Sequence, residues 1–379
     1  MDKKIEELKV AIVHDWLVTY GGAERVVETM CEIFPQADIY TLIYDEEKMG
    51  HIFSKEKVKT TFIQKFPKAT KLYTKMLPLM PRAFEELDLE DYDMVLSSSS
   101  CCAKGVITSP STIHIAYIHS PMRYAWDLYY DYRNKSGYFT KLFMSLFMPS
   151  IRQWDVISST RIDKVLANSN YISKRIKKYW GRDSEVVYPP IEVERLEANG
   201  KKAENFYVAF SRFVPYKRID LAVKACTELK KNLVVIGDGE QREYLKSIAG
   251  ETVIFTGRLS DEKVKDYLQR CKAMIFCAEE DFGIVPLEVQ ACGRPVIAYG
   301  KGGSLETVVE DVTGTFFNEQ TVESVKSQIL KFEKMVFNTD KIVEHAKSFS
   351  KDRFKKEIKE IALEAINYSK SLKSRHEII

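Results

Sequence analysis

The sequence has no hydrophobic run that could cross a membrane, and it has no apolar leader. No uncharged stretch reaches the roughly 18 residues that a bilayer span needs, and the N-terminal segment MDKKIEELKVAIVHDW lacks the apolar region of a secretory signal. The seven cysteines contain no CxxC pair, which disfavours both a disulfide framework and a zinc site. We therefore expect a cytoplasmic protein without a bound metal.

The sequence also lacks a strong net charge and the common nucleotide fingerprints. Its 57 Lys and Arg nearly balance 54 Asp and Glu, so the net charge of +3 gives no reason to expect a nucleic-acid partner. Neither G-x-G-x-x-G nor G-x-x-x-x-G-K-[ST] occurs, which disfavours nicotinamide and P-loop chemistry. The 379 residues, 45% hydrophobic and 29% charged, are enough for two ordinary globular domains.

What the sequence does contain is an alternation of short apolar runs with amphipathic segments. Val/Ile-rich runs separated by helical periods predict parallel sheets covered by helices on both faces. The predicted strands are 9–15, 37–44, 93–99, 113–120, 164–169 and 185–190 in the first half, and 206–212, 232–239, 252–258, 273–279 and 295–300 in the second. The fold class is therefore α/β, with two doubly wound, Rossmann-like domains.

The domain boundary is expected where Pro189 and Pro190 lead into a polar stretch. This gives domains at 1–190 and 191–350, and a C-terminal helix at 351–379 that crosses back to the first domain. Polar residues follow most predicted strands, and ligands of open α/β sheets bind outside the carboxyl ends of the strands. We therefore expect the two domains to face each other across one ligand-binding cleft.

Two features of the first half could contact such a ligand. Gly21 and Gly22 precede the helical segment AERVVETMCEIF, where they would let a phosphate or sugar approach the helix amides. An ordinary tight turn explains them equally. His119 ends a predicted strand just before Pro121 and could be either a structural or a catalytic residue.

The second half holds a denser constellation. Arg212 ends a strand and Lys217 opens the next helix, which suits a diphosphate, although both could be ordinary surface residues. In EEDFGIVPLEVQACGRPVIA, helix capping explains one acidic residue better than three. Glu280 and Glu288 could accept hydrogen bonds from sugar hydroxyls, beside the unpaired amides of residues 282–285. Together these groups predict a site for a nucleotide-sugar.

The motifs GGAER, SRFVPYKRID, VVIGDGEQREYL, IFTGR and EEDFGIVPLEVQACGRPVIAYGKGG occur in this order over nearly the whole chain. With them the sequence resembles the retaining glycosyltransferases of family 4, which have the GT-B fold. The resemblance implies cofactor-free, metal-independent transfer of a sugar from a nucleotide diphosphate donor with retention of configuration. The spacing of Glu280 and Glu288 matches the E-x7-E motif of that family. Arg218 departs from the family pattern, in which glycine is frequent after the lysine.

The resemblance also implies roles for individual residues. Glu288 would bind the donor ribose, Glu280 the donor sugar, and Arg212 with Lys217 the leaving diphosphate. The full set of donor-binding positions is Gly21, Gly22, Arg212, Lys217, Arg258, Leu259, Glu280, Phe282, Gly283, Ile284, Val285 and Glu288. The positions implied in catalysis are His119, Arg212, Lys217 and Glu280, where His119 would contact the donor sugar.

Three further segments, FEELDLEDYDMVLSSSSCCAKGV, HSPMRYAWDLYYDY and VVYPPIE, resemble bacterial GDP-mannose-dependent mannosyltransferases of surface polysaccharide or O-antigen assembly. This narrower resemblance implies a lipid-linked saccharide acceptor, with Arg123 and Tyr124 as acceptor-binding residues. The alternatives are a transferase with a UDP-sugar donor, an epimerase or phosphorylase of the same fold, and a module that binds without catalysis.

A lipid-linked acceptor would give a purpose to two other features. Residues 48–82 carry nine Lys and Arg against a single acid, and segment 138–154 has an apolar stripe of Phe139, Leu142, Phe143, Leu146 and Phe147. Such a combination is typical of a protein on an anionic membrane surface. A helix buried in the core has the same pattern, and on periodicity alone we expect the core helix.

Overall fold

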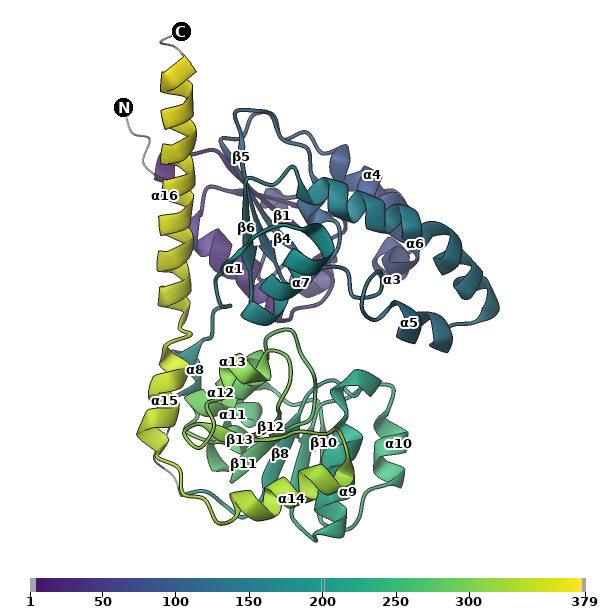
Figure 1. Cartoon of the computed structure of the whole chain (residues 1–379), viewed down its shortest axis with the longest axis vertical. Helices are drawn as coiled ribbons and strands as arrows, with labels where there is room; N and C mark the ends of the chain where they lie inside the picture. Colours follow the sequence, from purple (N-terminus) through teal and green to yellow (C-terminus); the bar gives the residue numbers. More distant parts are fainter. Residues whose placement is uncertain (1–4, 199, 201, 377–379) are drawn as a thin grey trace. The chain divides into compact units, whose positions relative to one another are not determined.

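The computed structural model describes residues 5–198, 200 and 202–376, and it contains two compact units (Figure 1). The first unit comprises Met1–Tyr188 and Phe354–Ile379, and the second comprises Pro189–Arg353. Each unit is built around one parallel β-sheet with helices on both sides.

The sheet of the first unit has seven parallel strands in the order β3-β2-β1-β4-β5-β6-β7. The strands are β1 (Val10–His14), β2 (Asp38–Thr41), β3 (Val58–Thr60), β4 (Met94–Ser99), β5 (Ile113–Ile118), β6 (Lys164–Ala167) and β7 (Glu185–Val186). The order reverses between β1 and β4. At such a reversal, the loops that follow the two neighbouring strands run to opposite faces of the sheet. This leaves a crevice between them at the carboxyl edge.

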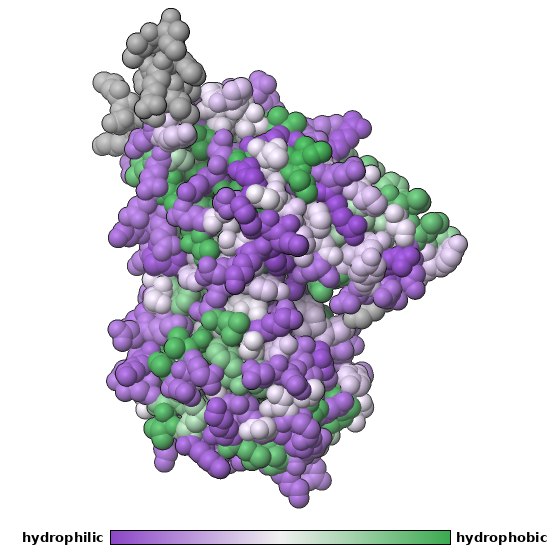
Figure 2. Space-filling model, viewed as in Figure 1, coloured by the Kyte–Doolittle hydropathy of each residue, from purple (hydrophilic) through white to green (hydrophobic). Residues whose placement is uncertain are grey.

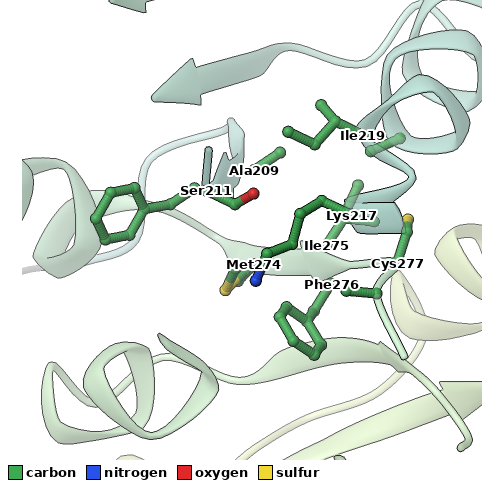
Figure 3. A pocket seen from close by; sticks show the side chains of 11 residues that line it. Ala209, Ser211, Lys217, Ile219, Met274, Ile275, Phe276 and Cys277 are labelled. Carbon is green, nitrogen blue, oxygen red and sulfur yellow. The ribbon is translucent and has the colours of Figure 1, made fainter. Parts of the chain in front are cut away.

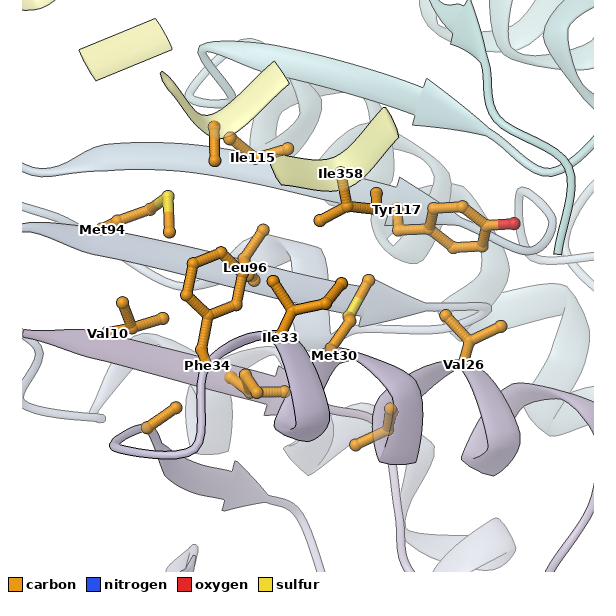
Figure 4. Close-up of a cluster of buried hydrophobic side chains, with 14 of the residues drawn as sticks. Val10, Val26, Met30, Ile33, Phe34, Met94, Leu96, Ile115, Tyr117 and Ile358 are labelled. Atoms are coloured by element: carbon orange, nitrogen blue, oxygen red, sulfur yellow. The ribbon is translucent and has the colours of Figure 1, made fainter. Parts of the chain in front are cut away.

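Successive residues of β1 face opposite sides of this sheet, and each side has its own hydrophobic core. Val10 and Ile12 belong to the same cluster as residues of α1 (Gly22–Ile33) and Ile358 of the C-terminal helix α16 (Lys351–His376). Figure 4 shows Val10, Ile358 and several of the α1 side chains in this cluster. The other core includes residues of α4 (Met80–Glu85) and α6 (Tyr138–Ser159). The remaining helices of this unit are α2 (Glu46–Met49), α3 (Ala69–Leu72), α5 (Tyr129–Lys135) and α7 (Asn170–Trp180), with 3-10 turns at Ile5–Glu7, Lys55–Lys57, Phe62–Lys65, Tyr73–Leu79 and Ala103–Gly105.

The sheet of the second unit has six parallel strands in the order β10-β9-β8-β11-β12-β13, which reverses between β8 and β11. The strands are β8 (Tyr207–Phe210), β9 (Leu233–Ile236), β10 (Val253–Gly257), β11 (Ala273–Phe276), β12 (Val296–Tyr299) and β13 (Gly314–Phe317). The helices are α8 (Val193–Leu196), η6 (Pro215–Lys217), α9 (Ile219–Glu228), α10 (Arg242–Ser247), α11 (Asp261–Arg270), α12 (Ile284–Ala291), α13 (Ser304–Thr307), α14 (Val322–Phe332) and α15 (Thr339–Lys347).

The α/β class and the two doubly wound sheets confirm the prediction from the sequence. Every apolar run singled out there contains a strand of the structure, whereas β3 and β13 were not predicted. Strand β3 is a three-residue edge strand without a buried residue, and β13 is a four-residue strand that begins at a glycine. Neither offers enough alternation or apolar length to stand out from a loop.

The expectation for α6 was wrong in one respect, because its apolar stripe does not face the core. Phe139 is 84% exposed and Leu146 is 64% exposed, and Leu142 and Phe147 are exposed as well. The buried side of the helix instead carries Met144, Met148 and Ile151, packed in the same cluster as residues of α4. The sequence of α6 is apolar on more than one side, so periodicity did not identify the side that faces the protein. Figure 2 shows hydrophobic residues gathered over this end of the first unit.

A buried ion pair anchors α6 to the body of the first unit. The Nζ atom of Lys104 lies 3.1 Å from the carboxylate of Asp155, and both side chains are almost completely buried. The indole N–H groups of Trp126 and Trp180 donate to the same carboxylate at 2.8 and 2.7 Å. Because each charge is matched, the helix can be held by polar groups in a dry environment. Among the described residues, no helix is both long enough and apolar enough to span a bilayer.

We expect Lys104→Met to destabilise the protein by about 3–5 kcal/mol, because the substitution leaves the Asp155 carboxylate buried without its cation. Urea denaturation, followed by tryptophan fluorescence, would measure the change. Adding Asp155→Asn should restore part of the loss, since the neutral amide oxygen still accepts from the indoles. The control is Arg82→Met, which breaks an exposed Arg82–Glu86 pair and should change stability by less than about 1 kcal/mol. Equal losses in the two single variants would contradict this account.

Candidate functional site

The reversal of strand order in the first unit brings together three side chains from different strand ends. His14 ends β1, Ser98 lies opposite it in β4, and His119 follows β5. The Nε2 atom of His119 is 2.8 Å from Ser98 Oγ, and the Nδ1 atom of His14 is 3.1 Å from the same hydroxyl. Burial lowers the pKa of His119 to about 3, with a smaller contribution from His14, so its imidazole is neutral at physiological pH.

The carboxylate of Asp15 shapes the loop that follows β4. It accepts hydrogen bonds from the backbone amides of Ser100, Cys101, Cys102 and Ala103 at 2.6, 2.9, 2.8 and 2.8 Å. Asp15 is 1% exposed, so this cluster of amides stabilises a charge that would otherwise be costly to bury. The sequence placed Asp15 at a strand end but gave no sign that it organises a loop 85 residues away.

The two glycines are found at the start of α1, as the sequence predicted from the helical segment. Gly21 has extended backbone angles and precedes the helix, and Gly22 is its first residue. A Cβ atom at Gly21 would lie 3.2 Å from Oε2 of Glu24, so that carboxylate approaches the glycine backbone. Glu24 is buried and lies 3.6 Å from Nε2 of His14. The N-terminus of α1 therefore already holds a carboxylate, that of Glu24, which lies beside His14.

Of the two predicted acceptor-binding residues, Tyr124 is tied to the loop after β4. Its hydroxyl lies 2.9 Å from the Sγ atom of Cys101, and its ring contacts Tyr132 edge-on. Arg123 is half-buried in the same stretch between β5 and α5. Their binding of an acceptor stays a prediction.

In the second unit, the reversal between β8 and β11 brings Lys217 and Glu280 into direct contact. Lys217 lies in the η6 turn after β8, and Glu280 lies in the loop after β11. Beside them the ends of the two strands enclose a void of about 10 Å³, lined by Ser211, Lys217 and Phe276 among others (Figure 3). That volume holds about one water molecule. Lys217, a predicted diphosphate ligand, is thus paired with Glu280, while Arg212, the other predicted ligand, is exposed after β8.

Close backbone packing holds the loop that carries Glu280. Gly303 donates its N–H to the carbonyl oxygen of Glu280 at 2.8 Å. A Cβ atom would lie 2.5 Å from the Glu280 carbonyl oxygen if placed at Gly302, and 2.2 Å from Cα of Phe282 if placed at Gly303. Only glycine fits at these two positions. The sequence showed both glycines as part of a motif, but it did not indicate that they pack against the loop of Glu280. Gly283, with φ of +95°, then directs the chain into α12.

Glu288 has a different cationic neighbour from Glu280. It is 6% exposed in α12, and its Oε1 atom lies 4.0 Å from Nη2 of Arg195. Arg195 also contacts Glu192 at 3.0 Å and Asp261 at 2.9 Å. Glu280 thus contacts a lysine directly, whereas Glu288 shares Arg195 with two nearer carboxylates. Ile284 and Val285 open α12 and are half-buried, Arg258 is exposed after β10, and Leu259 is half-buried.

Arg218, which departs from the family pattern by standing where glycine is frequent, adopts the left-handed conformation. Its φ is +50° and its ψ is +36°, directly before α9. This conformation costs a non-glycine residue roughly 1–2 kcal/mol. The guanidinium contacts the carboxylate of Asp220 at 3.1 and 3.3 Å, which offsets part of the cost. The substitution therefore leaves the start of α9 intact at Ile219.

Both halves of the chain match models of known glycosyltransferase families. A family model described as Glycosyltransferase Family 4 matches residues 20–195, and one described as Glycosyl transferases group 1 matches residues 191–352. Together they span both units. Within the described residues, no group of three or more His, Cys, Asp or Glu side chains is arranged to hold a metal ion.

Several curated relatives are similar in sequence. Alpha-1,3/1,6-mannosyltransferase ALG2 of Saccharomyces cerevisiae is 25% identical over 377 residues, covering 80% of this chain and 72% of its own. A GDP-mannose-dependent alpha-(1-6)-phosphatidylinositol monomannoside mannosyltransferase of Mycolicibacterium smegmatis is 27% identical, covering 44% and 52%. An uncharacterized glycosyltransferase of Methanocaldococcus jannaschii is 27% identical, covering 51% and 56%. The chain thus spans between about half and three quarters of the length of these relatives.

Two solved structures share the fold. Anabaena Alr3699/HepE in complex with UDP superposes with a TM-score of 0.68 at 16% identity, covering 94% of this chain and 99% of that one. A glycosyltransferase from Rickettsia africae superposes with a TM-score of 0.64 at 15% identity, covering 95% and 99%. At such identities the likeness shows the two-domain GT-B fold alone.

We expect Glu280→Gln to tighten the binding of inorganic pyrophosphate by about 3–10-fold, because it removes the carboxylate that competes for Lys217 and repels the anion. Isothermal titration calorimetry of wild-type and variant protein would measure the dissociation constants. Lys217→Ala should weaken binding instead.

The matched control is Glu279→Gln, one residue earlier, whose carboxylate lies 3.1 Å from Lys301. It should change pyrophosphate affinity by less than about twofold, because this carboxylate pairs with a different, exposed lysine and not with Lys217. Weaker binding in Glu280→Gln than in the wild type would show that the ion pair does not compete with the anion.

Proposed function

Because the chain belongs to family 4 of the glycosyltransferases, we propose that it is a hexosyltransferase that moves mannose from GDP-mannose to a lipid-linked saccharide acceptor. The observation that carries the proposal is the contact of Lys217 with Glu280 at the switch point of the second sheet. Two relatives whose printed names specify mannosyl transfer, in yeast and in a mycobacterium, support mannose as the sugar. The product would be a surface polysaccharide or O-antigen.

Donor recognition follows from the charges around that contact. Lys217 exchanges Glu280 for the diphosphate, and the exposed Arg212 guanidinium approaches the same anion from the end of β8. The first-turn amides of α12, at Ile284 and Val285, offer further donors. Glu280, released by Lys217, then accepts hydrogen bonds from the sugar hydroxyls, and Glu288 does so from the ribose. These cations take the place that a divalent metal has in other nucleotide-sugar enzymes, so transfer is metal-independent.

Chemistry in this site relies on stabilisation of the leaving group. The bond between the sugar anomeric carbon and the phosphate oxygen breaks, and the acceptor oxygen bonds to the same face of that carbon, so configuration is retained. The acceptor hydroxyl gives its proton to the departing phosphate oxygen. Arg212, Lys217 and the α12 amides stabilise the charge that develops on the diphosphate. Glu280 as a covalent nucleophile is the alternative, but its contact with Lys217 favours a role in binding.

The acceptor's lipid gives a function to the exposed stripe of α6. Four exposed lysines in and around α3 have no ion-pair partner within the described part of the chain: Lys65, Lys68, Lys71 and Lys75. Ala69 of α3 and Met144 of α6 belong to the same hydrophobic cluster, so both segments lie on the same side of the first sheet (Figure 1). An apolar stripe and unpaired cations on the same side of a sheet suit an anionic membrane surface.

We expect GDP, without metal and in the presence of a chelator, to raise the thermal unfolding temperature, whereas UDP and ADP do so weakly. At 100 times its dissociation constant, a ligand of the native state stabilises it by about 2.7 kcal/mol. Arg212→Ala should abolish most of this shift and lower transfer by about 100-fold, as loss of one charge-stabilising donor does.

The control is Lys246→Ala, which removes a cation on α10 and should leave the GDP shift intact. If UDP alone stabilises the protein, mannose transfer from GDP-mannose is wrong and a UDP-sugar donor replaces it. Consumption of the donor without any acceptor would indicate an epimerase. If no nucleotide binds, the roles of Arg212 and Lys217 are wrong.

We expect the protein to co-sediment with vesicles of phosphatidylcholine and phosphatidylglycerol, and less with phosphatidylcholine alone. Replacing Phe139 and Leu146 by serine together should weaken binding by at least about 10-fold, since each apolar side chain contributes roughly 1.5–3 kcal/mol when fully buried. Val336→Ser is the matched control, because Val336 is 94% exposed in the second unit and should not affect sedimentation. Unchanged binding of the double variant would show that α6 does not meet the lipid.

A further inference from the structure

A row of four polar side chains runs beneath the carboxyl edge of the first sheet. Glu24 of α1 faces Nε2 of His14, the Nδ1 atom of His14 faces Ser98, and the Ser98 hydroxyl faces Nε2 of His119. Glu24, His14 and Ser98 are all buried, at 7%, 2% and 0% exposure. The leaving-group mechanism uses none of these three residues. Buried polar groups need defined partners, so the row must have one pattern of protons.

The contacts of His14 determine where the protons of the row lie. The Nδ1 atom of His14 lies 3.0 Å from the backbone carbonyl oxygen of Ser98, which can only accept, so this nitrogen carries a proton. The Ser98 hydroxyl, 3.1 Å from the same nitrogen, therefore cannot donate to it. Its remaining contact within the described residues is Nε2 of His119 at 2.8 Å. Ser98 thus donates its proton to His119, and Nε2 of His119 is an unprotonated acceptor.

A neutral imidazole without a proton on Nε2 carries it on Nδ1. Nδ1 of His119 has no hydrogen-bond partner in the described part of the chain, and it is not sealed from solvent. The ring also packs edge-on against Tyr117, at 5.2 Å between centroids, and the Tyr117 hydroxyl donates to the carbonyl oxygen of Val187 at 2.8 Å. The ring is therefore held in one orientation, with a single N–H left over for a ligand.

We propose that Ser98 and His14 are positioning residues that hold His119 as the Nδ1–H tautomer, so that this N–H donates to an oxygen of the donor sugar. The proposal rests on the proposed function for the identity of the ligand, but not for the tautomer. Glu24 completes the row by facing the other nitrogen of His14. In the opposite tautomer His119 would present a lone pair to the sugar and could no longer donate.

The charges along the row agree with this arrangement. Burial alone would lower the pKa of His14, but the adjacent Glu24 carboxylate, together with Asp15 and the Ser98 carbonyl, outweighs burial and raises it. His14 therefore tends to keep both protons. Burial and the nearby His14 lower the pKa of His119 to about 3. The two pKa shifts have opposite directions, so a positive charge on the row is favoured at His14 and disfavoured at His119.

The test that needs no substrate is ¹⁵N NMR of the six histidines at pH 7. We expect the wild-type spectrum to show His119 protonated at Nδ1 and unprotonated at Nε2. Ser98→Ala should convert it to a mixture of tautomers, and Ser98→Thr should preserve the wild-type pattern. A proton on Nε2 of wild-type His119 would overturn the proposal, whatever the variants do.

Ser97→Ala is the matched control. Ser97 precedes Ser98 in β4, is equally buried, and has its hydroxyl 2.8 Å from Nε2 of a different histidine, His114. Its loss should affect the signals of His114 and leave those of His119 unchanged. A change in the His119 tautomer in both variants would show that the strand as a whole, rather than the Ser98 hydroxyl, sets it.

Kinetics then separate positioning from a structural role. With GDP-mannose and acceptor, Ser98→Ala should lower kcat by at least about 10-fold, while the GDP dissociation constant changes by less than twofold. Ser98→Thr should recover most of the activity, and Ser97→Ala should lose less than threefold. Parallel losses of kcat and GDP affinity would contradict the proposal.

If the wild-type protein neither binds GDP nor transfers mannose, the proposed function fails, and the NMR result still decides the tautomer. Should Ser98→Ala not fold, the wild-type spectrum and Ser98→Thr remain decisive.

Discussion

The reversal of strand order in each sheet is the constraint on which the rest of the candidate site depends. In a parallel sheet all carboxyl ends meet at one edge, and the reversal separates the loops there so that side chains can converge. In the first unit this brings His14, Ser98 and His119 together, and in the second it brings Lys217 to Glu280. None of these neighbours is close in sequence. The strand order of each sheet thus determines which of these side chains lie close together.

A second regularity, seen within each unit separately, is that the candidate carboxylates lie beside basic side chains. Glu280 pairs with Lys217, Glu288 lies beside Arg195, and Glu24 faces His14. Half-buried or buried carboxylates would be unstable without such partners. The same pairing sets a cost for binding, because an anionic ligand must displace a carboxylate from its cation. A donor that brings both a diphosphate and hydroxyls can satisfy the lysine and the carboxylate at once, whereas a simple anion satisfies only the lysine.

The sequence predicted the strands well because buried parallel strands are continuous apolar runs, as in residues 233–236 and 296–299. It did not predict β3 and β13, which are short, and it gave the wrong orientation for α6 because several faces of that helix are apolar. The motif around Glu280 was visible because it is local. The row from Glu24 to His119 was not, because it depends on the register between β1 and β4, residues 84 positions apart. Local chemistry can be predicted from sequence, whereas pairings between strands require the fold.

The exposed stripe of α6 can also be understood through its anchor. An exposed Phe139 and Leu146 give no stability to the monomer and increase the risk of aggregation, so large apolar patches usually mark a binding surface. The helix does not depend on that stripe, because Met144, Met148 and the buried Lys104–Asp155 pair hold its other side. One side of α6 thus stabilises the fold, while the other side presents an exposed apolar surface. A lipid-linked acceptor would make this separation useful, because the stripe could enter the membrane without loosening the sheet that positions His119.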